Sequence, residues 1–286
     1  MKELSACHVT VVGLGLMGAS LAAALNGRCA EVSGIARRSE TVEEAVRRGV
    51  IRRGATDPEV LLPGADIVVL ATPVRTILHQ IGRYGSLLAD GALLIDLGST
   101  KREILEAMER LPAGVEPLGG HPMCGKEESG LAAADSDLYR GCTFILCPLE
   151  RTSAEALELG KSLARAAGGR PMVLDAERQD HLAATLSHLP YLLACALVRT
   201  ADALTSSDPA AWKIVAGGYR DTSRVAGCDV RMMLDILTTN RCEVLGAASA
   251  CRDRLDELVD LLAKGDDDAL ASVLATCRAE RWRMFP

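Results

Sequence analysis

The feature that most constrains the fold is a short apolar strand that runs directly into a glycine-rich turn. The segment from Val9 reads Val-Thr-Val-Val-Gly-Leu-Gly-Leu-Met-Gly, and the helix-forming segment Ala19–Leu25 follows it. In a G-x-G-x-x-G turn the first glycine permits a tight turn, the second lets backbone approach a pyrophosphate, and the third lets the helix pack on the strand. The helix N-terminus adds N–H groups and a positive dipole end. We predict a dinucleotide site here, formed by Gly13, Gly15, Leu16, Met17 and Gly18.

Short runs of Val, Ile and Leu alternate with segments of helical periodicity through the first 175 residues. The candidate strands are His8–Val12, Glu31–Ile35, Ile67–Ala71, Leu93–Leu97, Thr143–Cys147 and Pro171–Leu174. The candidate helices between them include Thr41–Arg48, Ile77–Leu88 and Ala154–Ala167. Such alternation predicts an α/β fold with a doubly wound, largely parallel sheet covered by helices on both faces.

A second, all-helical domain is predicted after Asp175, where the strand signals stop. The length of 286 residues suits two domains. We place a Rossmann-type dinucleotide-binding domain at residues 1–175 and an all-α substrate and dimerisation domain at 176–286. Within them, capping boxes and a cap followed by proline mark expected helix starts. These are Thr100 with Glu103, Thr152 with Glu155, and Asp208 with Pro209.

Charge and cysteine usage narrow the class of partners. A net charge of −6 gives no general reason to expect nucleic-acid binding. The ten cysteines are scattered without a CxxC pair, and no signal peptide opens the chain, so we expect reduced thiols and a cytoplasmic protein. The most apolar helical stretch, Leu182–Val198, is interrupted by Ser187, His188 and Pro190, which favours a buried helix or a domain interface over a membrane span.

The residues after the second candidate strand bear on which nucleotide binds. An NAD site usually has an acidic residue at this position, about 20 residues beyond the glycine motif. Here Arg37, Arg38 and Ser39 follow instead, and these groups suit a 2′-phosphate. We therefore favour NADP over NAD, while two solvated arginines in a surface loop remain the alternative. Thr72 and Pro73, which follow the third candidate strand, complete the predicted cofactor site.

Four further motifs carry polar side chains that suit chemistry. They are Asp96-Leu-Gly-Ser-Thr-Lys101, Gly119-Gly-His-Pro-Met-Cys-Gly-Lys-Glu127, Ser187-His-Leu-Pro-Tyr191 and Gly217-Gly-Tyr-Arg-Asp-Thr-Ser-Arg224. In this order and spacing they resemble the prephenate/arogenate dehydrogenase family of tyrosine biosynthesis, over nearly the whole chain. That resemblance implies oxidative decarboxylation of prephenate to 4-hydroxyphenylpyruvate, with hydride transfer to a nicotinamide. Arogenate, which would yield tyrosine directly, is the alternative substrate.

The resemblance also implies residue roles. His121 matches the family's catalytic histidine, and a neutral imidazole suits removal of the substrate hydroxyl proton. Ser99 matches a serine that hydrogen-bonds the same hydroxyl. Arg224 matches the arginine that binds a substrate carboxylate. His188 matches a second histidine that contacts the substrate, and Glu127 matches a residue that shapes the pocket. No metal is expected, and family members pair through the helical domain, so we expect a homodimer.

Each assignment has a structural alternative. His121 could be a turn histidine, Ser99 could merely end a strand, and His188 could be a hydrogen-bonded core histidine. Arg224 could pair with Asp221 on a helix surface, since three-residue spacing allows it. The roles of Lys101, Arg220 and Asp221 stay open, and Cys124 is interpreted as a small pocket residue.

Two departures from the family pattern stand near the substrate. Gln179 replaces a histidine that many relatives carry before an aspartate, and Met233 stands where some have tryptophan. Two other functions remain open. A β-hydroxyacid dehydrogenase shares the glycine opening, but it uses a lysine in a glycine-rich helix, a setting that Lys161 and Lys213 lack. The second function that remains open is that of a non-catalytic NADP-sensing protein with the same fold.

Overall fold

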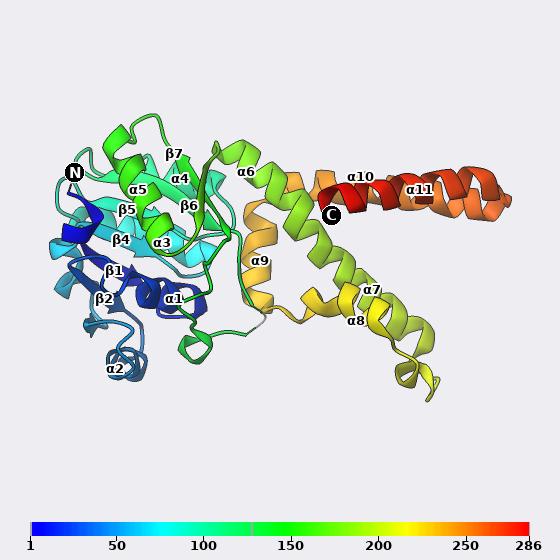
Figure 1. Cartoon of the computed structure of the whole chain (residues 1–286), viewed down its shortest axis with the longest axis horizontal. Helices are drawn as coiled ribbons and strands as arrows, with labels where there is room; N and C mark the ends of the chain where they lie inside the picture. Colours follow the sequence, from blue (N-terminus) through cyan, green and yellow to red (C-terminus); the bar gives the residue numbers. More distant parts are fainter. Residues whose placement is uncertain (1, 127, 286) are drawn as a thin grey trace.

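The computed structural model describes residues 2–126 and 128–285, and it divides into an α/β part and a helical part (Figure 1). The α/β part contains β1 His8–Val12, α1 Leu16–Leu25, β2 Glu31–Ile35, α2 Ser39–Arg47, β3 Arg53–Ala55, β4 Ile67–Leu70, α3 Val74–Tyr84, β5 Leu93–Asp96, α4 Arg102–Met108, β6 Glu116–Pro122, β7 Thr143–Pro148, α5 Ala154–Ala166 and β8 Arg170–Val173. The helical part contains α6 Ala176–Ala183, the π-helical turn η6 Ala184–His188, α7 Leu189–Thr205, α8 Gly217–Ser223, the short 3₁₀ helix η8 Arg224–Gly227, α9 Val230–Thr239, α10 Arg241–Lys264 and α11 Asp267–Met284.

The eight strands form one sheet in the order β3-β2-β1-β4-β5-β6-β7-β8. All neighbouring pairs are parallel except β6 with β7, which is antiparallel. The chain runs outward from β1 to β3 and then returns to the other side of β1 with β4. The strand order therefore reverses between β1 and β4, and ligands of such sheets bind at the carboxyl ends of strands at that point. The predicted fold class is confirmed.

Strands β3 and β6 were missed in the sequence. The sequence of β6, Glu-Pro-Leu-Gly-Gly-His-Pro, contains two prolines and two glycines, residues that are depleted in strand interiors. The glycines are nevertheless required by packing. A Cβ at Gly120 would lie 2.4 Å from the carbonyl oxygen of Asp96 on β5, and one at Gly119 would lie 3.1 Å from the Lys101 side chain.

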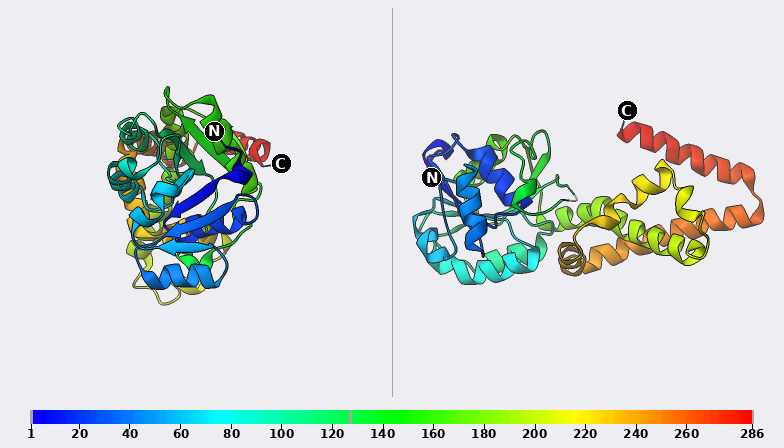
Figure 2. Two further views of the ribbon diagram at one scale, coloured as in Figure 1. Left: turned by 90° about the vertical axis from the view of Figure 1, so that its left-hand side faces the viewer. Right: turned by 90° about the horizontal axis from the view of Figure 1, so that it is seen from below.

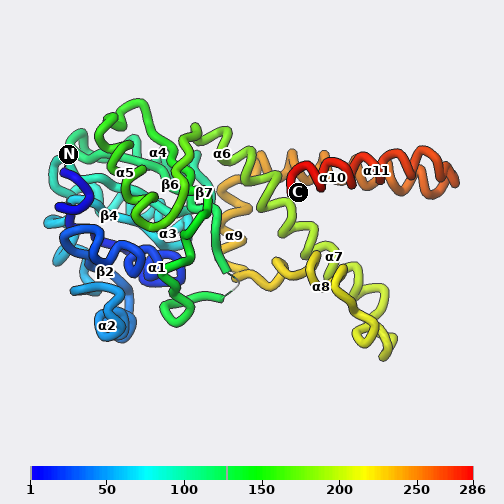
Figure 3. The backbone as a smooth tube through the Cα atoms, viewed as in Figure 1, coloured from blue at the N-terminus to red at the C-terminus, as the bar shows by residue number. Residues whose placement is uncertain are grey.

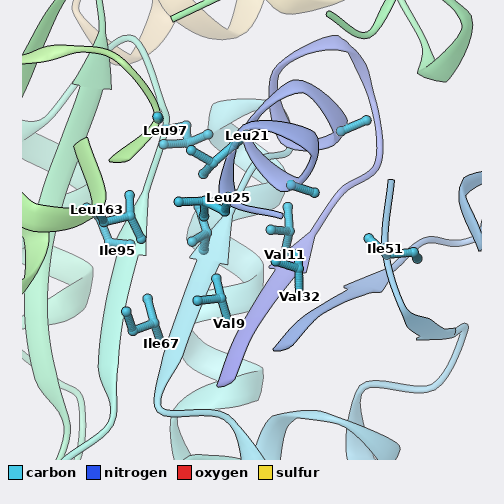
Figure 4. Packing of buried hydrophobic residues seen from close by; sticks show 14 of the residues in the cluster. Val9, Val11, Leu21, Leu25, Val32, Ile51, Ile67, Ile95, Leu97 and Leu163 are labelled. Carbon is cyan, nitrogen blue, oxygen red and sulfur yellow. The ribbon is translucent and has the colours of Figure 1, made fainter. Parts of the chain in front are cut away.

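The core lies on both faces of this sheet, as Figure 4 shows for one of them. Leu21 and Leu25 of α1 pack against Val9 and Val11 of β1, and all four side chains are fully buried. Burial of one such leucine stabilises the fold by roughly 1.5–3 kcal/mol. On the opposite face α3 and α4 cover β4 and β5. The core thereby fixes the β1–α1 turn and the end of β5.

Three predicted helix caps are wrong, although α4 and α5 begin within two residues of the predicted capping threonines. Helix α5 is capped by Ser153, which accepts from the Ala156 N–H, while Thr152 donates to the Pro117 carbonyl on β6. Helix α4 has no cap from its own segment, because the Thr100 hydroxyl pairs with Thr239 of the helical part.

Asp208 accepts from the Ala210 N–H in a turn that leads into a short 3₁₀ helix, so no α-helix begins at Asp208-Pro209. In all three places the predicted threonine or aspartate does form a hydrogen bond, either with a backbone group or with a distant hydroxyl. The partner differs from the one that local sequence suggests.

The helical part extends away from the sheet, and the chain reverses between α10 and α11 at its far end, from where α11 diverges from α10 (Figures 2 and 3). The change from strands to helices falls between β8 and α6. The predicted boundary between residues 175 and 176 lies in this interval. That the two parts are separate domains stays a prediction. One helix in the described chain, Ala176–Thr205, is long and apolar enough to span a membrane by length and composition alone.

The prediction of a buried helix at Leu182–Val198 holds only in part within a single chain. Leu186 is 70% exposed, and Leu182 and Leu193 are also exposed, whereas Ala194 is buried. The other interpretation, a helix that contributes to an interface, is compatible with this exposure. Pro190 lies in the first turn of α7, directly after the π-helical turn that ends at His188.

Candidate functional site

The β1–α1 turn provides space for a ligand at one of its three glycines. Gly13 has a φ of 103°, and a Cβ there would lie 2.6 Å from the Ala71 carbonyl oxygen. A Cβ at Gly18 would lie 1.9 Å from the Gly13 carbonyl oxygen, so helix and strand pack without room for a side chain. A Cβ at Gly15 would meet nothing within 4 Å. The backbone is therefore open at Gly15, where α1 begins with no side-chain cap.

The remaining predicted phosphate-site residues surround this opening. Leu16 and Met17 form the first turn of α1. Thr72, after β4, lies against Gly13 and donates from its hydroxyl to Gln80 Oε1 at 2.8 Å. Pro73 occupies the position directly before α3. The free N–H groups and positive dipole end of α1 suit a pyrophosphate at this position.

A pocket of about 630 Å³ lies beside the end of β2. Its lining combines Arg38 and residues of α2 with the 129–132 segment of the β6–β7 connection: Arg38, Glu40, Thr41, Glu44, Ser129, Gly130, Leu131 and Ala132. Arg37, Arg38 and Ser39 are exposed there. The connection is held in place by Arg48, which donates to the Leu131 carbonyl at 2.7 Å.

His121 lies near the end of β6 and is 7% exposed. The Gln179 side-chain amide of α6 donates to its Nδ1 at 2.6 Å. Burial lowers the pKa of His121 to about 3, and the positive charge of Lys101 adds to the effect, as does electrostatic repulsion from His188 when both rings are protonated. His121 is therefore neutral at physiological pH, the state that a proton acceptor needs.

A buried ion pair lies next to this histidine. Lys101 and Asp96 are both fully buried and paired, and Asp96 also accepts from the N–H groups of Gly98 and Gly120, at 2.7 and 3.0 Å. Burial raises the pKa of Asp96, while Lys101 and the two N–H groups oppose that effect. The pair holds the β5–α4 loop against β6. Lys101, whose role was left open, therefore helps to position the backbone around His121 through its ion pair with Asp96.

Ser99 lies in the same loop and is half-buried. Its carbonyl oxygen accepts from the Gln179 amide at 3.3 Å. Gln179 thus contacts both the loop that carries Ser99 and the ring of His121. The structure brings these two predicted catalytic residues together through one side chain of the helical part.

His188 approaches from the helical part. It is 1% exposed, at the end of the π-helical turn η6. The Asn240 amide nitrogen lies 3.4 Å from its Nδ1, a contact that favours a hydrogen on Nε2, and the buried Nε2 has no hydrogen-bond partner within the described chain. Burial lowers the pKa of His188 to about 4. A neutral imidazole with an unused N–H is a hydrogen-bond donor for a ligand.

Polar contacts join the two parts of the chain around the site. Asp180 of α6 accepts from the backbone N–H groups of Lys101 and Arg102, at 2.6 and 3.0 Å, and so caps α4 from another domain. The Asn240 amide donates to the Asp180 carbonyl at 2.7 Å. These residues were missed in the sequence, except that Asp180 was noted beside Gln179. Their partners lie 60 to 79 positions away, so no local pattern points to them.

The other predicted substrate residues are less closely tied to this group. Arg224 is exposed at the start of η8, which packs against α7, the helix that follows His188. Glu127 lies outside the described residues. Met233, noted as a departure, is buried on α9, and Cys124 is half-buried against the core. Within residues 2–126 and 128–285, no group of three or more His, Cys, Asp or Glu side chains could hold a metal ion.

The chain was compared with known families and structures. A family profile described as prephenate dehydrogenase, nucleotide-binding domain, matches residues 21–173, and one described as prephenate dehydrogenase, dimerization domain, matches residues 175–276. A prephenate dehydrogenase of Lactococcus lactis is 33% identical, over 92% of this chain and 73% of the relative.

Two solved structures extend the similarity to three dimensions. The prephenate dehydrogenase from A. aeolicus, in complex with hydroxyphenyl propionate and NAD⁺, superposes with a TM-score of 0.91 at 30% identity, covering 99% of this chain and 100% of that one. Synechocystis arogenate dehydrogenase superposes with a TM-score of 0.84 at 30% identity, covering 97% of this chain and 99% of that one.

Proposed function

The chain belongs to the prephenate dehydrogenase family, and we propose that it oxidises and decarboxylates prephenate to 4-hydroxyphenylpyruvate with NAD(P)⁺ as the hydride acceptor. It is an NAD(P)-dependent oxidoreductase. The observation that carries the proposal is His121, a buried and neutral imidazole beside the β5–α4 loop of a dinucleotide-binding sheet. Family membership removes the basis for the β-hydroxyacid dehydrogenase and the non-catalytic interpretations.

The chain's own residues move the proton in this reaction, and a bound nicotinamide would accept the hydride. The ring carbon that bears the hydroxyl loses a hydride, and the bound nicotinamide supplies the acceptor. His121 takes the hydroxyl proton as the C–O bond gains double-bond character. The C–C bond to the ring carboxylate then breaks, its electron pair completes the aromatic ring, and carbon dioxide leaves. The proton returns from His121 to the phenolic oxygen. Such a base contributes roughly 10²–10⁴ in rate.

Substrate binding is assigned to both domains. Ser99 hydrogen-bonds the hydroxyl that His121 deprotonates. His188 donates its unused Nε2–H to the substrate from the helical part. Arg224 binds a carboxylate, because a guanidinium can form two parallel hydrogen bonds to it. Glu127 is assigned to substrate binding by its match to the family pattern alone.

The cofactor is held by the glycine turn, with its pyrophosphate at the open backbone of Gly15 and the N-terminus of α1. We propose a preference for NADP, supported by Arg37, Arg38 and Ser39 at the end of β2. Arg38 lines the pocket there together with Glu40 and Glu44, and Glu44 pairs with Arg47 rather than with Arg38.

We also propose a cytoplasmic homodimer in which two copies pack through their helical parts. The matched dimerisation domain and the exposed apolar side chains of that part support this, among them Leu204, Ile214, Leu245, Leu255, Val259 and Leu262. All ten cysteines are free thiols in the structure, which suits a reducing compartment.

The test is an assay of four combinations, prephenate or arogenate with NAD⁺ or NADP⁺, following formation of the reduced nicotinamide and identifying the aromatic product. We expect the highest kcat/KM with prephenate and NADP⁺. Turnover of arogenate alone would reassign the substrate, and turnover of neither would reject the proposed function.

A further inference from the structure

Gln179 holds the catalytic histidine from the opposite domain. Its side chain is fully buried in the first turns of α6. The amide nitrogen lies 2.6 Å from His121 Nδ1 and 3.3 Å from the Ser99 carbonyl oxygen. The amide oxygen, Oε1, is also buried and has no hydrogen-bond partner in the part of the chain that the structure describes. The Gln179 amide nitrogen therefore makes two donor contacts, while the acceptor oxygen of the same amide forms no hydrogen bond within the described residues.

These contacts decide which ring nitrogen of His121 carries the hydrogen. An amide NH₂ group only donates, so Nδ1 accepts and the hydrogen resides on Nε2. Since Nδ1 is occupied, Nε2 is the nitrogen left for a substrate. In this tautomer Nε2 can donate to a hydroxyl oxygen, but it has no lone pair with which to take the hydroxyl proton. General-base catalysis needs the other tautomer, with the hydrogen on Nδ1.

The unused Oε1 provides the acceptor that this second tautomer requires. A half-turn of the Gln179 amide exchanges its oxygen and nitrogen, which occupy nearly the same volume. Oε1 then faces Nδ1–H of His121, and Nε2 of the ring presents a lone pair. The half-turn gives up the contact with the Ser99 carbonyl and places two oxygens near each other. The orientation seen in the structure is therefore favoured until a substrate hydroxyl donates to His121 Nε2.

We propose that Gln179 is a positioning residue that selects the tautomer of His121. In the free enzyme its amide donates to Nδ1, and in the reactive complex its Oε1 accepts Nδ1–H, which makes Nε2 the proton acceptor. The change involves no net proton, because Nε2 gives its hydrogen to solvent water and Nδ1 takes one from water. The statement about the reactive complex rests on the proposed function, whereas the statement about the free enzyme concerns the unliganded protein alone.

Several charged or titratable groups surround the pair. Lys101, bound to Asp96, faces it from the β5–α4 loop, Asp180 adjoins it on α6, and His188 faces it from η6. Lys101 and His188 disfavour the protonated form of His121. A carboxylate at position 179 would act in the opposite direction, because it accepts only and carries negative charge.

Three variants separate tautomer selection from packing. Gln179→Glu holds Nδ1–H without a half-turn, and we expect the acid limb of kcat/KM to move up by about one pH unit or more, with kcat above that limb largely retained. Gln179→Met keeps the length but cannot hydrogen-bond, and we expect kcat to fall by roughly 10- to 100-fold with little change in KM. Arg178→Gln is the matched control, because it alters net charge by the same amount on an exposed position of the same helix. It should leave the acid limb in place.

Ring-nitrogen NMR shifts of His121 provide a readout that needs no turnover. We expect an unprotonated Nδ1 in the free wild-type protein and a protonated Nδ1 in Gln179→Glu. A protonated Nδ1 in both proteins, or an acid limb in Gln179→Glu that matches Arg178→Gln, would overturn the proposal. The NMR outcome needs no substrate, so it differs from a failure to oxidise prephenate. If Gln179→Met does not fold, the comparison of the other two variants still decides.

Discussion

His121 and His188 are both buried and neutral, and this has a consequence for activity against pH. Their pKa values lie at about 3 and about 4, because burial disfavours the imidazolium in each. The value of kcat/KM reports the free enzyme. We expect kcat/KM to stay flat from about pH 8 down to about pH 5.5, with no limb at the ordinary histidine pKa of about 6.5. A limb near 6.5 that disappears in His121→Asn would contradict the buried, neutral histidine.

The same two residues link stability to pH. A histidine whose pKa is lowered in the folded protein binds fewer protons there than in the unfolded chain between the two pKa values. Folding stability is therefore fully present above about pH 6.5 and decreases as the pH falls toward 4 and then 3. Thermal denaturation between pH 7.5 and 5 should show a falling Tm, and His188→Asn should flatten part of the slope.

At the scale of one element, we expect two glycine-to-alanine changes in the β1–α1 turn to affect different properties. One should lower stability, and the other should weaken cofactor binding. Gly18→Ala places a Cβ 1.9 Å from the Gly13 carbonyl oxygen, so it should lower Tm by several degrees or prevent folding. Gly15→Ala meets nothing within 4 Å in the unliganded chain, so its Tm should change by less than about 2 °C. Its KM for the nucleotide should rise at least about tenfold, because the methyl group occupies the space for pyrophosphate. Equal cofactor KM in Gly15→Ala and wild type would place the phosphates elsewhere.

Helix α4 depends on a cap from the other domain. Asp180 accepts from the Lys101 and Arg102 N–H groups, and Asp180→Ala would leave both without an acceptor. The expected loss is about 2–3 kcal/mol, which corresponds to a Tm lower by roughly 4–10 °C. Asp180→Asn keeps one acceptor oxygen and should lose about half as much. Indistinguishable melting curves for Asp180→Ala and wild type would show that the interdomain cap adds no stability.

How far the sequence predicts these elements depends on the range of their contacts. Strand β1 and its glycine turn are local patterns, and they were placed correctly. Strand β6, which carries His121, was missed because proline and glycine conceal it, although its motif identified the histidine. The caps of α4 and α5 were assigned to the nearest threonine, whereas the structure uses Asp180 and Ser153. Contacts across 79 positions have no local signature.

At the scale of the whole molecule, the helical part exposes many large apolar side chains, which is typical of a protein–protein interface. Leu255 and Val259 lie one turn apart on α10 and are 58% and 54% exposed. If α10 packs against a second copy, replacing both by Asp should convert a dimer to a monomer at micromolar concentration. Val60→Asp, at a 64% exposed position of the α/β part, is the control and should leave the dimer intact. Light scattering after size exclusion measures the mass. A wild-type monomer would reject the homodimer.

In the proposed reaction, His121 takes the hydroxyl proton of a ring that Arg224 binds. The most direct measurement is the rate of hydride transfer in a single turnover with prephenate, together with the prephenate Kd, for wild type, His121→Asn and Arg224→Gln. We expect His121→Asn to slow hydride transfer by about 10²–10⁴ while Kd changes only a few-fold. Arg224→Gln should mainly raise Kd. Fast hydride transfer in His121→Asn, or the two effects exchanged between the variants, would contradict these roles.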